Sequence, residues 1–451
     1  MNMRHICDRK VCNERKEVEM SMEATVNKPA KYPVFRWFVL ASAILMMFFS
    51  MMTGLAVAPL MGVIAKDLGV DIGTASFGIM GLNIFSGAVG VIIAGYLLDK
   101  LGIFKVMLGS MVLLIIANTS YLFLGHSFEG VVFIRVLIAL GGSVGLIAIN
   151  PVVSIWFPEK ERGLALGLNA LTMLGAICGF ILGPSFAQMA GSWQMGMAWL
   201  SGILVLGLIF MLGVAANVGK YQVVTQSDAS VASKSTGEDN FWKFIKGNQA
   251  FWLGLAVMAL SNWANNAFND LSPGYLAVDP PVGVGYGPEV AGQFSSGTWV
   301  GVLLGIFIGG IVIDKVFKGK SGILIIVGFI CNLIFFNGIL CQPIYGNPTI
   351  LSFWLLAAGF VNPFTAVGNQ YFAIKSFSPD VIGKVSATWT SISNFIGAFG
   401  VMLGSYALSS TGTYHVSFAI VAIVSVLGII AAMLSKDRRS AIEAAYKQQS
   451  A

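Results

Sequence analysis

The sequence predicts an all-α membrane protein of twelve transmembrane helices, arranged as two pseudo-symmetric six-helix halves. The first reason is composition, because 56% of the 451 residues are hydrophobic and only 11% are charged, whereas a soluble domain carries about 25% charged residues. The second is that long apolar runs alternate with short charged breaks, which is typical of membrane-spanning helices. The third is a set of landmarks repeated at a nearly constant spacing, which indicates two homologous halves of the same orientation.

The repeat is most evident in a short loop motif. The segment from Gly95 to Lys100 recurs from Gly310 to Lys315, so that Asp99 and Asp314 are 215 positions apart. Two further pairs have almost the same spacing: Pro59 with Pro273, and Asn150-Pro151 with Asn362-Pro363. A duplicated six-helix half places a substrate site between the halves.

The apolar runs predict each span in order. The N-terminal half (34–216) holds spans near 35–61, 74–98, 104–124, 130–156, 163–187 and 195–216. The C-terminal half (250–434) holds spans near 250–274, 289–313, 321–342, 350–374, 383–409 and 413–434. The connection 217–249 is rich in Ser, Thr and Lys and is expected to be a flexible cytoplasmic linker. Residues 1–33 are expected to form a disordered cytoplasmic tail, and 435–451 a second cytoplasmic tail.

Basic residues predict the orientation. With the N-terminus in the cytoplasm, every Lys and Arg except Lys66 and Arg135 falls in a segment on the cytoplasmic side, as the positive-inside rule requires. We therefore expect a multi-pass protein of the cytoplasmic (inner) membrane with both termini cytoplasmic. The net charge of +6 then reflects contact with anionic membrane lipids and not nucleic-acid binding. The five Cys have neither disulfide spacing nor metal-ligand partners, so we expect no metal and no cofactor.

Four motifs resemble those of the major facilitator superfamily. The loop Gly95-x-x-x-Asp99-Lys100-x-Gly102-x-x-Lys105 resembles its signature loop between helices 2 and 3, and Asp314-Lys315 belongs to a partial second copy. The other three are Trp156-Phe157-Pro158-x-x-x-Arg162-Gly163, Arg135 with Gly141-Gly142, and Gly175-x-x-x-Gly179-x-x-x-Gly183-Pro184, the last of which is frequent in antiporters. The resemblance covers about residues 35–434, lies nearest to prokaryotic metabolite and organic anion permeases, and implies that helices 1, 4, 7 and 10 line a central cavity.

The loop charges are candidates for gating. The resemblance implies that Asp99, with Lys100 and Arg162 beside it, closes the cytoplasmic side in one state, and the repeat extends this role to Asp314. A carboxylate at a helix end can also interact with a neighbouring helix dipole. The alternative is that these are ordinary loop charges that set topology.

Helix 7 carries the sharpest polar pattern. Asn262, Asn265, Asn266 and Asn269 follow at i, i+3, i+4 and i+7, on one helix face. Amides are unfavourable against lipid, so this face must contact protein or water. Two interpretations stay open, a substrate-binding wall and hydrogen bonds between helices. The remaining candidates for substrate binding are Asn150, Asn362, Asn369, Trp389 and Asn394.

Two charged residues that lie away from the very ends of the predicted spans complete the candidate site. Arg135 could bind an anionic substrate or modulate a proton site, and its alternative is a side chain that reaches outward to the interface. Asp270 is the one carboxylate expected near the cavity, so proton coupling, exchange and facilitated diffusion all stay open.

These observations predict a secondary transporter that moves a small polar or monoanionic metabolite by alternating access, acting as a monomer. The competing hypothesis is an exporter of multiple hydrophobic compounds, against which the Asn face argues. A transporter-like sensor is disfavoured because the linker and tails are short. An enzyme is disfavoured because no nucleophile–base pair, HExxH or paired carboxylate lies within the spans.

Overall fold

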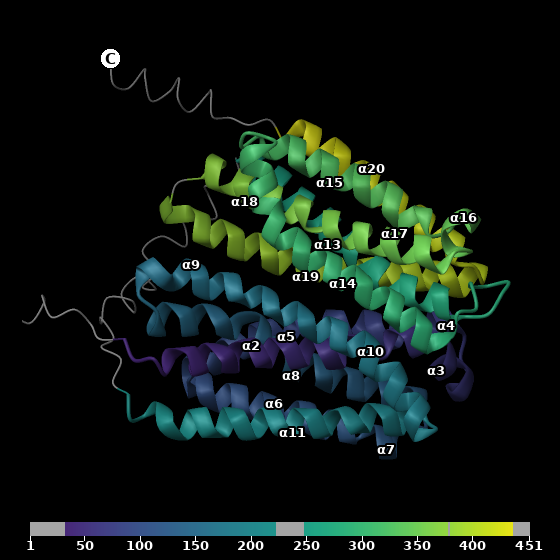
Figure 1. Cartoon of the computed structure of the whole chain (residues 1–451), viewed down its shortest axis with the longest axis horizontal. Helices are drawn as coiled ribbons and strands as arrows, with labels where there is room; N and C mark the ends of the chain where they lie inside the picture. Colours follow the sequence, from purple (N-terminus) through teal and green to yellow (C-terminus); the bar gives the residue numbers. More distant parts are fainter. Residues whose placement is uncertain (1–31, 222–247, 378, 436–451) are drawn as a thin grey trace, which may run out of the picture.

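The computed structural model describes residues 32–221, 248–377 and 379–435. The described part is helical throughout (Figure 1). In the N-terminal half the elements are α2 (Arg36–Leu55), η1 (Ala58–Leu60), α3 (Met61–Leu68), α4 (Ile72–Ser76), η2 (Phe77–Gly81), α5 (Leu82–Leu101), α6 (Ile103–Thr119), α7 (Tyr121–Leu124), α8 (Phe128–Trp156), α9 (Glu159–Gly167), η3 (Leu168–Thr172), α10 (Met173–Ala190) and α11 (Trp193–Val218). In the C-terminal half they are α13 (Gln249–Ala277), α14 (Gly287–Lys315), α15 (Ser321–Gly338), α16 (Gln342–Tyr345), α17 (Pro348–Val361), α18 (Pro363–Ser376), α19 (Pro379–Thr411) and α20 (Tyr414–Leu434).

The predicted all-α membrane architecture is confirmed. Eleven helical stretches of the described chain are long and apolar enough to span a membrane, and each overlaps a predicted span. The one predicted span that is not among the eleven is the seventh in order, near 250–274. It corresponds to α13, which has 29 residues. This helix carries the four Asn and Asp270, so the polar face that makes it a candidate site also lowers its hydropathy. Most of both predicted tails and most of the predicted linker lie outside the described residues.

Glycines set the packing distance between helices in the N-terminal half. A Cβ added at Gly175, Gly179 or Gly183 of α10 would lie only 2.1–2.4 Å from a carbonyl oxygen of the first span. The three oxygens belong to Phe48, Met52 and Ala56, which are also four residues apart. The glycine motif of α10 therefore lets two backbones approach closely, which is how helices associate where lipid provides no hydrophobic force between them.

The repeated prolines have different effects in the two halves. Pro151 and Pro273 lie inside the continuous helices α8 and α13. Pro59 instead lies in η1, where the first span is interrupted, and Pro363 begins α18 after the break that follows α17. Since proline removes a backbone donor, the interruptions free carbonyl groups, and those of the first span become important below.

The two halves lie one above the other and meet at the end of the molecule that carries α3 and α4 (Figure 1). There α4, η2 and α5 pack against α19, and η1 packs against α13 and α14. We call this the closed end. At the opposite end, the main packing partners of α9 and α18 belong to their own halves, and both described chain ends lie toward that side in Figure 1.

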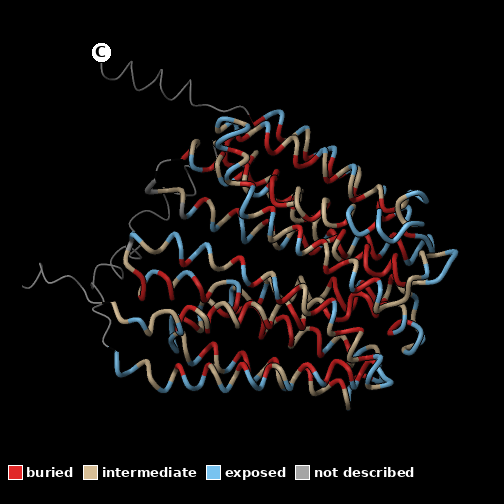
Figure 2. Tube along the Cα trace, in the orientation of Figure 1, coloured by how far each residue is buried: buried red, intermediate tan, exposed pale blue. Residues whose placement is uncertain are grey.

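Burial follows the same division. Buried residues concentrate between the helices of each half and toward the closed end (Figure 2). The outward helix faces expose large apolar side chains such as Ile92, Phe123 and Phe353, each at least 70% exposed. An apolar outer surface of this kind suits contact with lipid and not with water.

Candidate functional site

A cavity of about 280 Å³ lies between the two halves. Its N-terminal wall comes from α2, η2, α5 and α8, and its C-terminal wall from α13, α14 and α19. The N-terminal wall is largely apolar, with Met47, Met51 and Met80, whereas the C-terminal wall is largely polar. The polar lining residues are Ser50, Asn83, Ser143, Asn266, Asn269, Asp270, Trp299 and Asn394.

The Asn face of α13 divides between two roles. Asn262 donates 3.0 Å hydrogen bonds to Ser393 and Asn394 of α19. Asn265 accepts a hydrogen bond from Asn362 at the break before α18. These two amides therefore join helices within the C-terminal half.

The other two amides of this face line the cavity. Asn266 and Asn269 belong to its wall, and their side chains have no hydrogen-bond partner among the described residues. Both side chains are half-buried, and an amide without a protein partner is free to bond water or a ligand. Asn266 and Asn269 are therefore the amides available to a bound molecule.

Three predicted binding residues lie elsewhere. Asn369 donates a 3.1 Å hydrogen bond to the carbonyl of Gly254 and, with Trp389, borders a second cavity of about 320 Å³ inside the C-terminal half. Trp389 is 1% exposed and packs against the rings of Phe372 and Phe377, as a core residue does. Asn150 is exposed on α8 and does not line the central cavity.

Arg135 is fully buried, so it does not extend outward to the interface. Its Nη atoms donate to the carbonyl oxygens of Thr53 (3.1 Å) and Gly54 (2.7 Å), at the end of α2, and its Nε donates to the carbonyl oxygen of Ile79 (2.9 Å). The first two carbonyls are released where the helix is interrupted before Pro59, and the third lies in the π-helix η2.

The guanidinium of Arg135 therefore lies directly behind the cavity wall. Gly54 and Met80 both line the cavity, and Nη2 of Arg135 contacts the Gly54 oxygen at 2.7 Å and the Met80 sulfur at 3.4 Å. Arg135 is close enough to Asp270, on the opposite wall, for an electrostatic interaction. Of the side chains that the structure describes as buried, these two are the charged ones.

Asp270 joins the two halves where the closed end meets the cavity. Its Oδ2 accepts a 2.5 Å hydrogen bond from the Ser76 hydroxyl of α4, and the Ser76 and Ser405 hydroxyls are 2.6 Å apart. We call Ser76, Asp270 and Ser405 the seal cluster. Neither serine was predicted from the sequence, and the same holds for four polar residues of the cavity, Ser50, Asn83, Ser143 and Trp299. Their signal would have been a polar side chain inside a predicted span.

Asp71 adds a polar contact on the outward side of the seal cluster. It caps α4, since its carboxylate accepts 2.9 Å from the Thr74 amide and 2.5 Å from the Thr74 hydroxyl. Burial alone would raise the pKa of Asp71, but hydrogen bonds from Thr74, the Ser409 hydroxyl and the Gly73 amide together bring that pKa below its ordinary value. Because Ser409 belongs to α19, this carboxylate faces the other half.

The predicted gating residues lie at the opposite end and make no bond between the halves within the described chain. Asp99 is exposed, and Lys100 lies 5.7 Å from the Tyr96 ring. Asp314 accepts a 2.7 Å hydrogen bond from Tyr371 within its own half. Arg162 donates to the carbonyls of Phe157 (3.2 Å) and Ser154 (3.0 Å), so it caps the end of α8.

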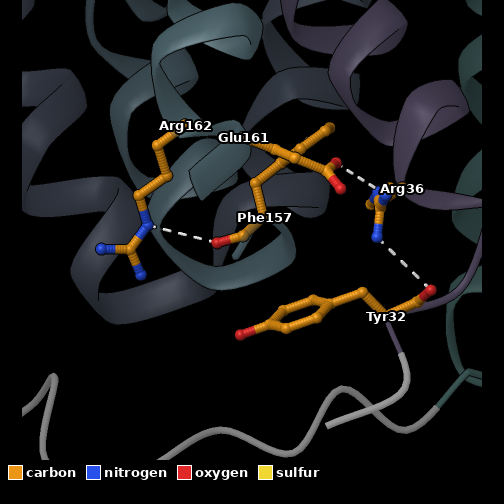
Figure 3. Close-up of polar contacts among 5 residues, drawn as sticks. All are labelled: Tyr32, Arg36, Phe157, Glu161 and Arg162. Carbon is orange, nitrogen blue, oxygen red and sulfur yellow. Dashed lines mark hydrogen bonds and ion pairs between the residues drawn. The ribbon is translucent and has the colours of Figure 1, made fainter. Parts of the chain in front are cut away.

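Figure 3 shows how α9 is tied to the start of α2 beside this cap. Arg36 pairs with Glu161 at 2.7 Å and donates to the carbonyl of Tyr32 at 3.4 Å. These contacts hold the end of the N-terminal half together as one body. A rigid half is what a rocking motion between halves requires.

Comparisons with known proteins agree with this architecture. A sequence model of the Major Facilitator Superfamily matches residues 41–337. Among solved structures, the chain is similar to a bacterial homologue of the human lysosomal transporter Spinster in its inward-facing, unoccupied conformation. The TM-score is 0.69 and the identity 13%, over 89% of this chain and 97% of that one.

Similar proteins are distant in sequence, with identities of 23–25% for the three that follow. A probable chloroplastic anion transporter of Oryza sativa is 24% identical over 60% of this chain and 54% of its own length. A putative glycerol-3-phosphate transporter of Arabidopsis thaliana is 25% identical over 73% of this chain and 69% of its own. A putative metabolite transport protein of Haemophilus influenzae is 23% identical over 76% and 83%. The chain thus spans about half the length of the first of these relatives.

Two helical halves with a cavity between them are the arrangement of many secondary transporters. The chain belongs to the Major Facilitator Superfamily. This confirms the resemblance that the loop and helix motifs indicated. The predicted cargo, a small polar or monoanionic metabolite, is compatible with the anion and metabolite transport named for the Oryza and Haemophilus relatives.

Proposed function

We propose that the chain is a secondary transporter that moves a small polar or monoanionic metabolite across the cytoplasmic membrane by alternating access. The observation that carries this proposal is the pair of unpartnered amides, Asn266 and Asn269, in a cavity between the halves. At about 280 Å³ the cavity is near the lower limit of ordinary ligand pockets, about 300–1,000 Å³. It therefore favours a small metabolite over a large hydrophobic drug.

The charges near the cavity are compatible with a monoanion. Arg135 places a positive charge behind Gly54 and Met80, and Asp270 places a carboxylate on the facing wall. The probable anion transporter and the putative glycerol-3-phosphate transporter among the relatives support an anionic cargo. Proton coupling and exchange are both compatible with a single carboxylate in the wall.

The proposed orientation places the closed end outside and the loops of Asp99 and Asp314 in the cytoplasm. Its support is the distribution of Lys and Arg. The alternating motion would open the closed end while the loops at the other end approach each other. Asp99 is exposed and unbonded within the described chain, so its gating contact would form in that second state.

A thermal-shift screen of purified protein tests the proposal, because a ligand that binds the folded state raises Tm by mass action. We expect small polar or monoanionic metabolites to stabilise the wild type and to lose this effect in Asn266→Ala and Asn269→Ala. The matched control is Asn217→Ala, which removes an amide at the exposed end of α11. Stabilisation by hydrophobic drugs alone would favour the exporter hypothesis instead.

A further inference from the structure

The seal cluster connects the cavity to the closed end through one side chain. Asp270 lines the cavity, and the same carboxylate holds Ser76 of the N-terminal half, which in turn contacts Ser405 of the C-terminal half. All three side chains are buried, with exposed fractions of 5%, 3% and 0%. The contact therefore excludes water while it joins the halves.

The bond from Ser76 is the direct hydrogen bond that stabilises this carboxylate. Asp270 Oδ1 is buried and has no partner among the described residues. Arg135 of α8 and Tyr414 of α20 act on Asp270 electrostatically, but Arg135 donates its hydrogen bonds at this wall to three carbonyl oxygens and a sulfur, and none to the carboxylate. Because a buried carboxylate without hydrogen bonds is strongly unfavourable, the halves cannot separate here until Asp270 obtains another partner.

The segment that carries Ser76 is suited to movement. Ser76 is the last residue of α4 and is followed at once by the five-residue π-helix η2. A π-helical turn is rare and is frequently found at functional sites. Gly73, one turn before Ser76, lies directly against the backbone of α19, where an added Cβ would meet Ser405 and Ser409 atoms at 2.3–2.6 Å. The closed end therefore depends on close backbone contact together with the seal cluster.

We propose that Asp270 transmits occupancy of the cavity to the closed end. A hydroxyl or ammonium donor on the cargo hydrogen-bonds to Asp270 from the cavity and replaces Ser76 as the partner of the carboxylate. The contact between Ser76 and Ser405 then no longer holds the halves together, and the closed end opens. This inference rests on the proposed function and adds a chemical requirement, that the cargo carries a hydrogen-bond donor at the group facing Asp270.

The test needs no knowledge of the cargo. All five native Cys are replaced by Ser, and Ala88→Cys places one thiol on the cavity wall formed by α5. An impermeant thiol reagent is then added to right-side-out or inside-out vesicles. In the parent protein we expect labelling mainly from the side opposite the closed end.

The diagnostic variant is Ser76→Ala, which removes the donor to Asp270. We expect labelling at position 88 from the closed-end side to rise about tenfold, the population change that follows loss of one hydrogen bond to a charged group. Ser76→Thr keeps the hydroxyl and should label like the parent. The matched control is Ser417→Ala, which removes a buried 2.7 Å hydrogen bond to Gly404, next to Ser405, but within the C-terminal half.

The outcomes separate the two proposals. If position 88 is labelled but Ser76→Ala behaves like Ser417→Ala, the seal cluster does not control the closed end. If position 88 is not labelled from either side in any variant, the cavity is not reached by water and the proposed transport function is wrong. Should Ser76→Ala fail to fold, Ser405→Ala carries the test, since it removes the second hydroxyl of the cluster, and labelling equal to that of Ser417→Ala would again overturn the inference.

Discussion

The guanidinium of Arg135 donates a 2.7 Å hydrogen bond to the carbonyl oxygen of Gly54, and so joins the first third of α8 to the interrupted end of α2. The same side chain also satisfies Thr53 and Ile79. A cation that bonds three carbonyls from two irregular helix segments fixes the shape of the wall that those segments form. Arg135 is therefore a positioning residue for the cavity, whatever its effect on the charge of the cargo.

Arg135→Lys should destabilise the protein by about 3 kcal/mol, within the range for breaking a buried charged network. One ammonium cannot reproduce the planar arrangement that reaches three carbonyls. Thermal unfolding in detergent measures the effect. Arg162→Lys is the control, because Arg162 also bonds two carbonyls but is only half-buried at a helix end. Equal losses in the two variants would show that Arg135 has no special positioning role.

Gly179→Ala should lower the free energy of unfolding by about 1–3 kcal/mol, the usual cost of overpacking. The added Cβ would lie 2.4 Å from the Met52 carbonyl oxygen, which belongs to backbone and cannot rotate away. The control is Gly202→Ala on α11, where nothing lies within 4 Å of the new Cβ. Expression and thermal unfolding of the two variants give the comparison. A Gly179→Ala protein as stable as Gly202→Ala would contradict the close contact of α10 with α2.

The spans were predictable because hydropathy depends on composition over about twenty residues, and the lipid environment leaves few alternatives. The role of Arg135 was not predictable, since its partners are carbonyl groups released by a helix interruption and by a π-helix. Pro59 indicates the helix interruption, but the π-helix η2 depends on packing against α8 and α19. Trp389 shows the same limit, because only the folded chain decides whether a tryptophan faces a cavity or a cluster of Phe residues.

Asp99→Asn should leave stability unchanged within about 0.5 kcal/mol, as is usual for surface substitutions. Asp99 is exposed and unbonded in the described chain. If it gates, its partner is met only when the closed end opens, so the variant should fold and express normally while transport in proteoliposomes falls at least several-fold. Tyr371→Phe is a useful comparison, because it removes the 2.7 Å bond to Asp314 within one half. Wild-type transport by Asp99→Asn would remove Asp99 from the gate.

The polar face of α13 shows what periodicity can predict and where it stops. Spacing alone placed four Asn on one side of the helix, and each of the four meets another helix or lines the cavity. In the structure the four residues have different neighbours. Asn262 contacts α19 and Asn265 contacts Asn362 just before α18, whereas Asn266 and Asn269 line the cavity. Sequence spacing cannot specify that division, because it depends on the position of helices from far along the chain.

Cysteine substitution on this face should reveal the division directly. In a background without native Cys, Asn266→Cys and Asn269→Cys should react with an impermeant thiol reagent, and a cargo that binds should protect at least one of them. Ala264→Cys, at a position that is 0% exposed, should react far less. Asn262→Cys should also react slowly.

The same four positions should differ in stability, which separates binding from packing. Asn262→Ala removes two hydrogen bonds to α19 and should lower the free energy of unfolding by about 1–2 kcal/mol. Asn266→Ala and Asn269→Ala remove none within the described protein, so they should unfold like the wild type while binding cargo about tenfold more weakly. Equal labelling at all four positions, with equal losses of stability, would mean that the whole face joins helices. The cargo site would then have to lie elsewhere in the cavity, nearer to Asn83 and Ser143 on the opposite wall.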